Sequence, residues 1–291
     1  MNRSLAFFGA LLATGVALST ACLAEAGEPI RFTLETQRGN PAEIHATFQQ
    51  EGERDHDNRW STGFMPSDFI GLEVSSFHAA GTRPIHFAVV REPGRLDCAG
   101  TGGSNFATGT CRFSENDGFV RLLINNGIGR PTYEQAIGLM AVNARGELVR
   151  AVAAAHYPTP RINDLMALSA LGVDGRYIAE MSRAGYRPQT LQKLVEFKAL
   201  GITPSWIAGF VQAGYGNVPG DGLIQMRALG ITPDFIQGFR RIGYRELPVS
   251  MLVQLKALDV TPDFVRAVAR PGEPMPPVSK LVELRMFSKR R

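Results

Sequence analysis

The sequence contains little cysteine and none of the common catalytic motifs. It has three cysteines in 291 residues, and no two of them form a CxxC pair. The zinc-peptidase motif HExxH, the nucleophile-elbow motif GxSxG and the Walker phosphate loop are all missing. The sequence therefore predicts a protein that is not an enzyme, with no catalytic residue, no cofactor and no metal site.

Two stretches resemble binding motifs only in part. Arg54-Asp55-His56-Asp57 has residue types that can bind a metal ion, but His45, His78, His86 and His156 are scattered elsewhere, and we interpret the stretch as a solvated loop. The run AGTGGSNFATG has the glycines of a phosphate loop without its lysine or its following helix. We expect a flexible hairpin loop from Gly100 to Gly109.

Long apolar runs are missing beyond the first residues. Arg3, the 14-residue apolar run Leu5 to Leu18 and the small-x-small site Ala24-Glu25-Ala26 predict a signal peptide over residues 1–26. The mature protein is then soluble and periplasmic or secreted. An alternative is lipid anchoring through Cys22, although a lipoprotein signal prefers Leu where Ser19 stands.

The charge is distributed unevenly along the chain. Residues 27–160 contain 12 Arg and no Lys against 15 acidic residues, a net charge of −3. Residues 161–291 contain 18 basic and 11 acidic residues, a net charge of +7. A basic half is compatible with acidic polysaccharide, lipid headgroups or an acidic protein surface as partner, and a merely solvated basic face is a further interpretation.

Residues 27–118 have the alternating pattern of β-strands. Ile30, Phe32 and Leu34 alternate with polar residues, and the same pattern recurs around Phe48 and Phe87. We expect an antiparallel sheet of five or six strands.

Two cysteines, Cys98 and Cys111, fall on adjacent strands of one predicted hairpin. In an exported protein this placement predicts a disulfide, and two buried thiols are the alternative.

Residues 132–291 contain a repeat of 29 residues. Gly172, Gly201 and Gly230 keep this interval, and Asp259 takes the fourth place. A fixed period of this length indicates a repeat architecture in which each unit packs on its neighbours. We expect five units and a terminal half-unit, preceded by a helical connector over residues 119–131.

Each unit is predicted to be a hairpin of two helices of eight to ten residues. We expect Asn163, Asp221, Ser250 and Ser279 to cap the first helix, with Gln192 as the odd member of that column, and a left-handed glycine such as Gly201 to end the helix. Thr-Pro pairs such as Thr232-Pro233 start the second helix. The aromatic column consists of one residue per unit at helical spacing, and we interpret it as core rather than as a ligand stripe: Tyr177, Trp206, Phe235 and Phe264.

The phrases ALGITPSWIAGFVQAGY and ALGITPDFIQGFRRIGY resemble tandem helical-hairpin repeats of uncharacterised bacterial exported proteins. Similar repeats are appended to some antibiotic-sensing membrane metallopeptidases, whose zinc motif is missing here. The resemblance covers about Thr132 to Phe287 and implies a fold without an activity. Leu200-Gly201-Ile202 is also similar to a DNA-binding helix–hairpin–helix, but Thr203-Pro204 replaces the second glycine that presents a backbone amide to phosphate.

The fold class expected is α+β, a small antiparallel β domain followed by a solenoid-like array of helical hairpins. The expected function is a non-enzymatic binding or scaffold protein whose repeats dock a protein partner in the cell envelope. Binding of an acidic glycan or the envelope surface through the basic repeat face is the alternative. DNA binding and an enzyme of unfamiliar type come last.

Overall fold

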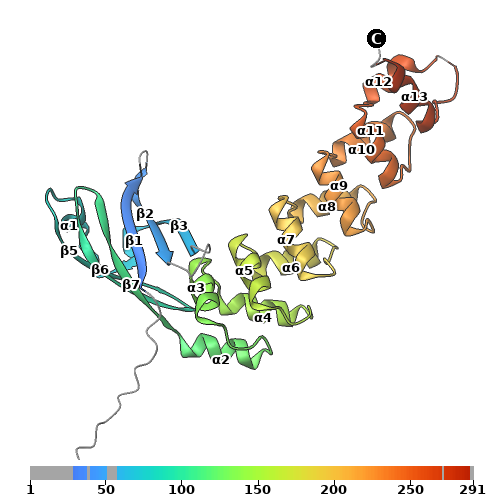
Figure 1. The fold of residues 1–291 in the computed structure, drawn as a ribbon. Helices are drawn as coiled ribbons and strands as arrows, with labels where there is room; N and C mark the ends of the chain where they lie inside the picture. The colour runs from blue at the N-terminus through green and yellow to red at the C-terminus, as the bar shows by residue number, and fades with distance from the viewer. Residues whose placement is uncertain (1–28, 38–39, 51–57, 271, 289–291) are drawn as a thin grey trace, which may run out of the picture.

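The computed structural model describes residues 29–37, 40–50, 58–270 and 272–288. Its α+β architecture confirms the predicted fold class: an antiparallel sheet is followed by a run of helices (Figure 1). The predicted signal peptide, the alternative anchor Cys22 and the Arg54–Asp57 cluster lie outside the described residues. Among the described helices, none is by itself long and apolar enough to cross a membrane.

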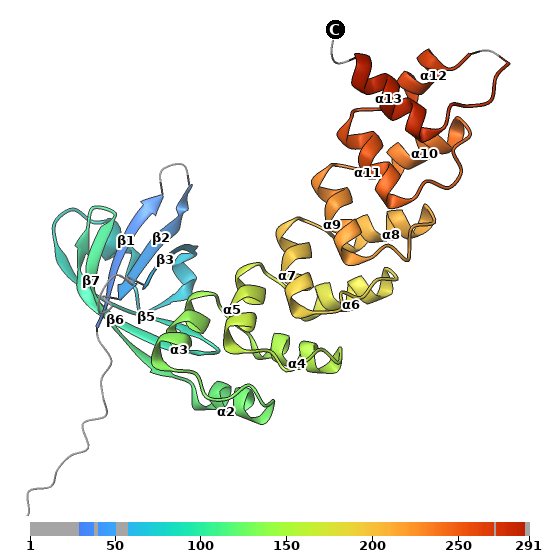
Figure 2. The ribbon, with the colours of Figure 1, turned by 45° about the vertical axis from the view of Figure 1, so that its right-hand side comes forward.

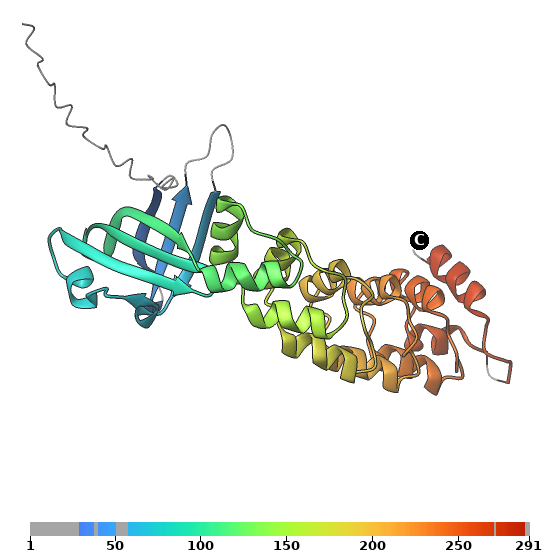
Figure 3. The same ribbon diagram turned by 90° about the horizontal axis from the view of Figure 1, so that it is seen from below.

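The sheet has seven strands, more than the five or six expected, in the order β3-β2-β1-β7-β6-β5-β4. The strands are β1 (Ile30–Gln37), β2 (Asn40–Gln50), β3 (Asn58–Phe64), β4 (Phe69–Ile70), β5 (Arg83–Arg91), β6 (Gly94–Gly103) and β7 (Phe106–Glu115). The sheet curls, as Figure 3 shows. The predicted alternation holds, because Ile30, Phe32 and Leu34 are buried in the core of the sheet. A short helix, α1 (Val74–His78), packs on β5, β6 and β7.

The expected loop from Gly100 to Gly109 is wrong, because these residues continue β6 and β7. Gly100 lies opposite Gly109, and a Cβ on Gly100 would come within 2.1 Å of the Thr108 carbonyl oxygen. The glycines thus permit close strand approach rather than flexibility. The turn is confined to Ser104 and Asn105, which have the positive φ angles of 53° and 68° that a tight hairpin needs.

On the same hairpin, Cys98 lies directly opposite Cys111. Their sulfur atoms are 2.03 Å apart in a disulfide, and both residues are buried. The bond therefore ties together two central strands on the core face of the sheet.

After α2 (Asp117–Asn125), ten helices form five pairs, and an eleventh follows them. Figure 2 shows the first helices of the pairs in one row and the second helices in another. The first helices are α3 (Tyr133–Ala141), α5 (Ile162–Ala170), α7 (Leu191–Ala199), α9 (Gly220–Ala228) and α11 (Val249–Ala257). The second helices are α4 (Gly146–Ala154), α6 (Gly175–Arg183), α8 (Pro204–Gln212), α10 (Pro233–Arg241) and α12 (Pro262–Val268). The last helix is α13 (Val278–Ser288).

Two columns of residues with positive φ follow the helices of the pairs, each directly after a helix C-cap except Gly272, because α12 already ends at Val268. The first consists of Asn143, Gly172, Gly201, Gly230 and Asp259, and the second of His156, Gly185, Gly214, Gly243 and Gly272. The left-handed conformation turns the chain back after each short helix. The non-glycine members therefore take the same backbone conformation at a steric cost that glycine avoids.

The second helices begin as expected, whereas the first helices do not. The hydroxyl of Thr232 accepts a hydrogen bond from the backbone N–H of Phe235, and Pro233 occupies the first turn. The predicted caps of the first helices are wrong: each of those helices begins two residues earlier, with Arg161, Thr190, Pro219 and Pro248 at the N-cap positions. Asn163, Gln192, Asp221, Ser250 and Ser279 lie inside the first turn instead.

The reason for this shift is local. The N-cap residues Arg161, Thr190, Pro219 and Pro248 all have an extended backbone conformation, so each helix starts directly after them. At the last two, the proline ring fixes φ. Asp221, inside the first turn, then benefits from the helix dipole without acting as a cap.

The first repeat is joined to the sheet. Ile137 and Met140 of α3 belong to the buried core of the sheet, beside which α3 lies in Figure 3. The guanidinium of Arg91, at the end of β5, donates to the carbonyl oxygens of Met140 and Ala141 at 2.7 and 2.9 Å. The carboxylate of Glu92 accepts from the backbone N–H of Gly146 at 2.8 Å. Apolar burial and three charge-assisted hydrogen bonds therefore fix the array to the sheet.

Candidate functional site at the junction of the sheet and the repeats

Each of the last four repeat interfaces contains a cation over an aromatic ring. Lys198 lies 4.6 Å from the ring centroid of Tyr177, and Lys256 lies 5.2 Å from that of Phe235. The guanidinium of Arg227 lies 6.0 Å from the ring centroid of Trp206, and that of Arg285 lies 5.0 Å from the ring centroid of Phe264. Cation and ring are always 21 residues apart, and both recur every 29 residues. These distances lie within the range of cation–π attraction, so the cations help to join successive repeats.

The arginines of this column also bind the end of the preceding first helix. Nε of Arg227 donates to the carbonyl oxygen of Leu200 at 2.9 Å, and Nε of Arg285 donates to that of Leu258 at 3.2 Å. Leu200 and Leu258 are the C-cap residues of α7 and α11, whose last carbonyls lack partners inside the helix. A side-chain cation at this end is also favoured by the helix dipole.

These contacts indicate whether the aromatic column belongs to the packing between repeats or to a binding surface. Tyr177 is buried, and Trp206, Phe235 and Phe264 are half-buried and pack against the core of the array. A cation of the next repeat covers each ring. The aromatic column therefore contributes to the packing between repeats, but three of its four rings are less buried than the side chains of the core.

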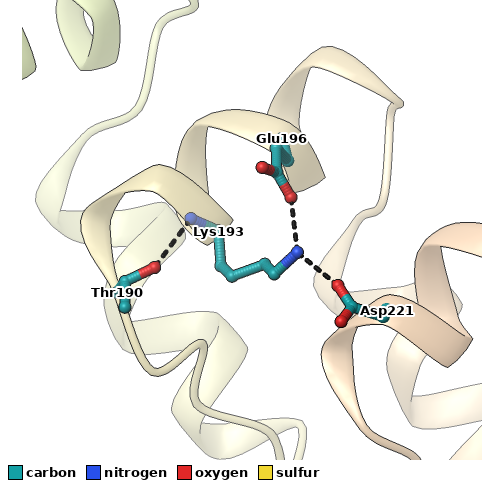
Figure 4. A network of polar contacts seen from close by, with 4 residues as sticks. All are labelled: Thr190, Lys193, Glu196 and Asp221. Atoms are coloured by element: carbon teal, nitrogen blue, oxygen red, sulfur yellow. Dashed lines mark hydrogen bonds and ion pairs between the residues drawn. The ribbon is translucent and has the colours of Figure 1, made fainter.

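A further contact between repeats is centred on Lys193, shown in Figure 4. Its Nζ atom lies 2.7 Å from Glu196 on the same helix and 2.5 Å from Asp221 of the next repeat. Hydrogen bonds to these carboxylates, that to Asp221 foremost, raise the pKa of Lys193. The hydroxyl of Thr190 accepts from the backbone N–H of Lys193 and caps α7.

The tyrosines that follow the left-handed glycines also join repeats. The hydroxyl of Tyr215 donates to the carbonyl oxygen of Leu247 at 2.7 Å, and that of Tyr244 donates to Pro276 at 2.5 Å. Arg240 lies over the Tyr215 ring and donates to the Ala213 carbonyl oxygen. These tyrosines and Arg240 therefore contribute to the packing between repeats.

Metal-binding side chains do not gather in the part of the chain that the structure describes. No group of three or more His, Cys, Asp or Glu residues capable of holding a metal ion occurs there. The glycine-rich run that resembles a phosphate loop is the β6–β7 hairpin.

Three pockets border the turn between α3 and α4, where the sheet meets the array. The apolar pocket has a volume of about 350 Å³ and includes Val142. The inter-repeat pocket, of about 240 Å³, includes Val142, Asn143 and Arg145. The polar pocket, of about 490 Å³, includes Asn143 and Arg145. The inter-repeat pocket shares Val142 with the apolar pocket, and Asn143 and Arg145 with the polar pocket, so the three adjoin at the α3–α4 turn. We call the three together the junction site.

The apolar pocket lies between the edge strand β3 and the helices α3 and α5. Trp60 of β3 forms one wall and stacks on Phe48 with ring centroids 5.3 Å apart. Ile137 and Met166 line the helical side. An aromatic wall, a flexible methionine and an unpaired strand edge form a surface suited to an apolar side chain of a partner.

The polar pocket is lined by charges from both parts of the protein. Arg91 contributes from β5, and burial lowers the pKa of its guanidinium, which the nearby Asp68 carboxylate partly offsets. The carboxylate of Glu92 already accepts a hydrogen bond from the backbone N–H of Gly146, and Arg145 is exposed at the rim. This pocket can therefore contribute polar contacts beside the apolar one.

Sequence reasoning did not identify the junction site. Its residues come from β3, the segment from Ser67 to Ile70, β5 and the turn after it, and the helices α3, α4 and α5 with their turns, which only the tertiary fold brings together. One signal was present in the sequence: Leu148 stands where later repeats have an aromatic residue, and Ser169 stands where they have a cation.

Comparison with known protein families, with curated proteins and with solved structures finds no match for this chain.

Proposed function

We propose that the chain is a non-enzymatic docking protein that acts outside the cytoplasm and binds a protein partner at the junction site. The observation that carries the proposal is the meeting of an apolar, a polar and an inter-repeat pocket around one turn. Interfaces combine an apolar anchor with flanking polar contacts in this way.

The attachment of the array to the sheet supports this proposal. Arg91 and Glu92 hold both sides of the α3–α4 turn through hydrogen bonds of 2.7 to 2.9 Å. A binding surface that is already formed in the free protein loses less conformational entropy when it docks a partner.

The use of the basic residues favours a protein partner over an acidic polymer. Lys193, Lys198, Arg227, Lys256 and Arg285 all contact an acidic group, an aromatic ring or a carbonyl oxygen of another repeat. Among the described residues of the basic half, 161–291, six arginines are exposed and form no ion pair. Arg187, Arg227 and Arg241 donate to backbone carbonyl oxygens, whereas Arg176, Arg183 and Arg245 have neither contact. The number of basic side chains available to bind an acidic glycan is therefore smaller than the net charge of this half suggests.

Site-specific photo-cross-linking tests the proposal. A photoreactive amino acid replaces Met166 in the apolar pocket or, as the control, Met251, an exposed methionine of α11. In the cell envelope, position 166 is expected to give one discrete protein adduct that position 251 does not give. The adduct is expected to disappear when Ala141→Glu places a charge in the pocket wall. Equal labelling at both positions would contradict the proposal.

A further inference from the structure

The last repeat interface shows how the array holds a guanidinium group. Arg285 of α13 lies over the ring of Phe264 at 5.0 Å. Its Nε donates to the Leu258 carbonyl oxygen at 3.2 Å, and its Nη2 lies 2.5 Å from Oδ2 of Asp259. The guanidinium thus has an aromatic wall, a helix C-cap carbonyl and the side chain of the residue with positive φ after it. Together these three groups compensate its loss of hydration.

The first repeat interface has the same framework without the cation. Four steps of 29 residues take Leu258 to Val142, Asp259 to Asn143, Phe264 to Leu148 and Arg285 to Ser169. Asn143 retains the left-handed conformation of Asp259, with φ 52° against 57°. Val142 is the C-cap residue of α3, as Leu258 is of α11. The positions of the two oxygen acceptors are retained, although the second is now an amide oxygen. Leucine replaces the aromatic wall, and serine replaces the arginine.

A pocket occupies the place of the missing side chain. Val142, Asn143, Leu148 and Ser169 all line the inter-repeat pocket of about 240 Å³. The hydroxyl oxygen of Ser169 is buried and has no hydrogen-bond partner among the described residues. A buried hydroxyl without a partner is costly, so a ligand that satisfies it gains affinity.

The charges at the rim of the pocket favour a cation. The carboxylates of Glu147 and Asp174 line it, and both residues are exposed, so the pocket is open to solvent on their side. Arg145 supplies one positive charge against these two negative ones. Asp174 also caps α6 by accepting from the backbone N–H of Tyr177 at 2.7 Å, which fixes the position of its carboxylate.

We propose that the inter-repeat pocket binds the guanidinium group of an arginine side chain from the partner protein. The guanidinium donates to the Val142 carbonyl oxygen, the Asn143 side-chain oxygen and the Ser169 hydroxyl, while its aliphatic stem packs on Leu148. This inference deepens the proposed function and rests on it for the source of the arginine. The pocket itself can be tested without the partner.

A titration with N-acetyl-arginine amide tests the pocket directly. Saturable shifts of the backbone amide signals of Asn143, Ser169 and Gly172 are expected in nuclear magnetic resonance spectra, because these residues line the pocket. The citrulline analogue has nearly the same shape without the charge, and it is expected to bind at least tenfold more weakly. Equal shifts with both compounds, or no saturable shift with the arginine compound, would overturn the inference.

A second variant tests the comparison between repeats. Ser169→Arg places a guanidinium on the chain itself, as at Arg285, and is expected to abolish binding of N-acetyl-arginine amide and to raise Tm by about 2–4 °C. Ser182→Arg makes the same change on the exposed surface of α6 and is expected to leave both unchanged. A folded Ser169→Arg variant that binds the compound as well as the wild type does would overturn the inference. Should that variant not fold, the titration of the wild-type protein still decides.

The two proposals fail in different ways. If the pocket does not bind N-acetyl-arginine amide but the cross-link at position 166 remains, the guanidinium site is wrong and the docking function stands. If the pocket binds the compound but position 166 labels no partner, the docking function is wrong and the pocket takes a cation from another source.

Discussion

The carboxylate of Glu92 accepts a hydrogen bond from the backbone N–H of Gly146 at 2.8 Å, across 54 residues of sequence. In the later repeats the second helix has its own capping side chain, which is Asp174, Thr203, Thr232 or Thr261. Arg145 at the same place provides no side-chain cap. The turn between β5 and β6 therefore supplies the cap that the first repeat lacks, and it couples the sheet to the array.

Removing this cap is expected to weaken the junction. Glu92→Ala should lower the free energy of unfolding by about 1–2 kcal/mol, the usual cost of a lost N-cap, as measured by urea denaturation. Glu246→Ala, an exposed carboxylate without an ion pair among the described residues, is the control and should change stability by less than about 0.5 kcal/mol. Equal effects of the two changes would mean that Glu92 does not act as the cap.

A pair of phenylalanines in α10 tests how the aromatic column is used. Phe239 is fully buried, whereas Phe235 is half-buried beneath Lys256. Phe239→Ala should cost about 3–5 kcal/mol and Phe235→Ala about 2–3 kcal/mol in denaturant unfolding. Thr232→Ala, which removes the cap of the same helix, should cost about 1 kcal/mol. A loss below about 1 kcal/mol for Phe235→Ala would instead assign the ring to a binding surface.

Alkaline pH is expected to weaken the packing of the second repeat on the third. Burial raises the pKa of Tyr177 from 10.0 to about 12, and its hydroxyl donates to the carbonyl oxygen of Ile202. Because the folded state favours the neutral phenol, this stabilisation is complete below pH 10 and is lost as the pH rises toward 12.

An ultraviolet titration of tyrosinate absorbance checks this pKa. Compared with Tyr177→Phe, the wild-type protein should show one additional tyrosine ionising near pH 12. A difference that titrates near pH 10 would show that the phenol is not buried in solution.

The two cysteines of the sheet are expected to be oxidised, as the proposed location outside the cytoplasm implies. Thiol titration of the unfolded, unreduced chain starting at Gly27 should find no free thiol, because Cys98 and Cys111 are bonded and Cys22 precedes this start. A result of two free thiols would exclude the disulfide. Reduction should destabilise the sheet by about 2–4 kcal/mol, the typical contribution of such a bond.

The sequence predicts the repeated parts of the fold well because the residues that start and end the helices recur at the same positions in each unit. The Thr-Pro starts and the positive φ angles after the helices are as expected, even where His156 or Asp259 replaces glycine, although α12 ends before Gly272. The starts of the first helices differ from the expectation because a polar residue in the first turn of a helix has the same pattern as an N-cap, and the extended residue two positions earlier varies between Arg161, Thr190, Pro219 and Pro248. The glycines of the β6–β7 hairpin have the composition of a loop, but in the structure Gly100 and Gly109 pack against each other on paired strands.

The candidate site could not be predicted in the same way. It depends on contacts between distant segments, such as Arg91 with Met140 and Trp60 with the pocket beside α3. It also depends on a missing side chain: Ser169 occupies the repeat position at which the last repeat interface has Arg285. A search for conserved-looking motifs overlooks a place where the repeated pattern is interrupted.

The most direct test of docking at the junction site is the affinity of the cross-linked partner, once purified, for two variants. Met166→Glu introduces a charge into the apolar pocket, whereas the triple change of Arg176, Arg183 and Arg245 to Ala removes exposed positive charge from the array. We expect Met166→Glu to raise Kd at least tenfold, about 1.4 kcal/mol, and the triple change to alter it less than twofold. The reverse result, with a Kd that rises steeply with salt, would place binding on the basic face and contradict the account.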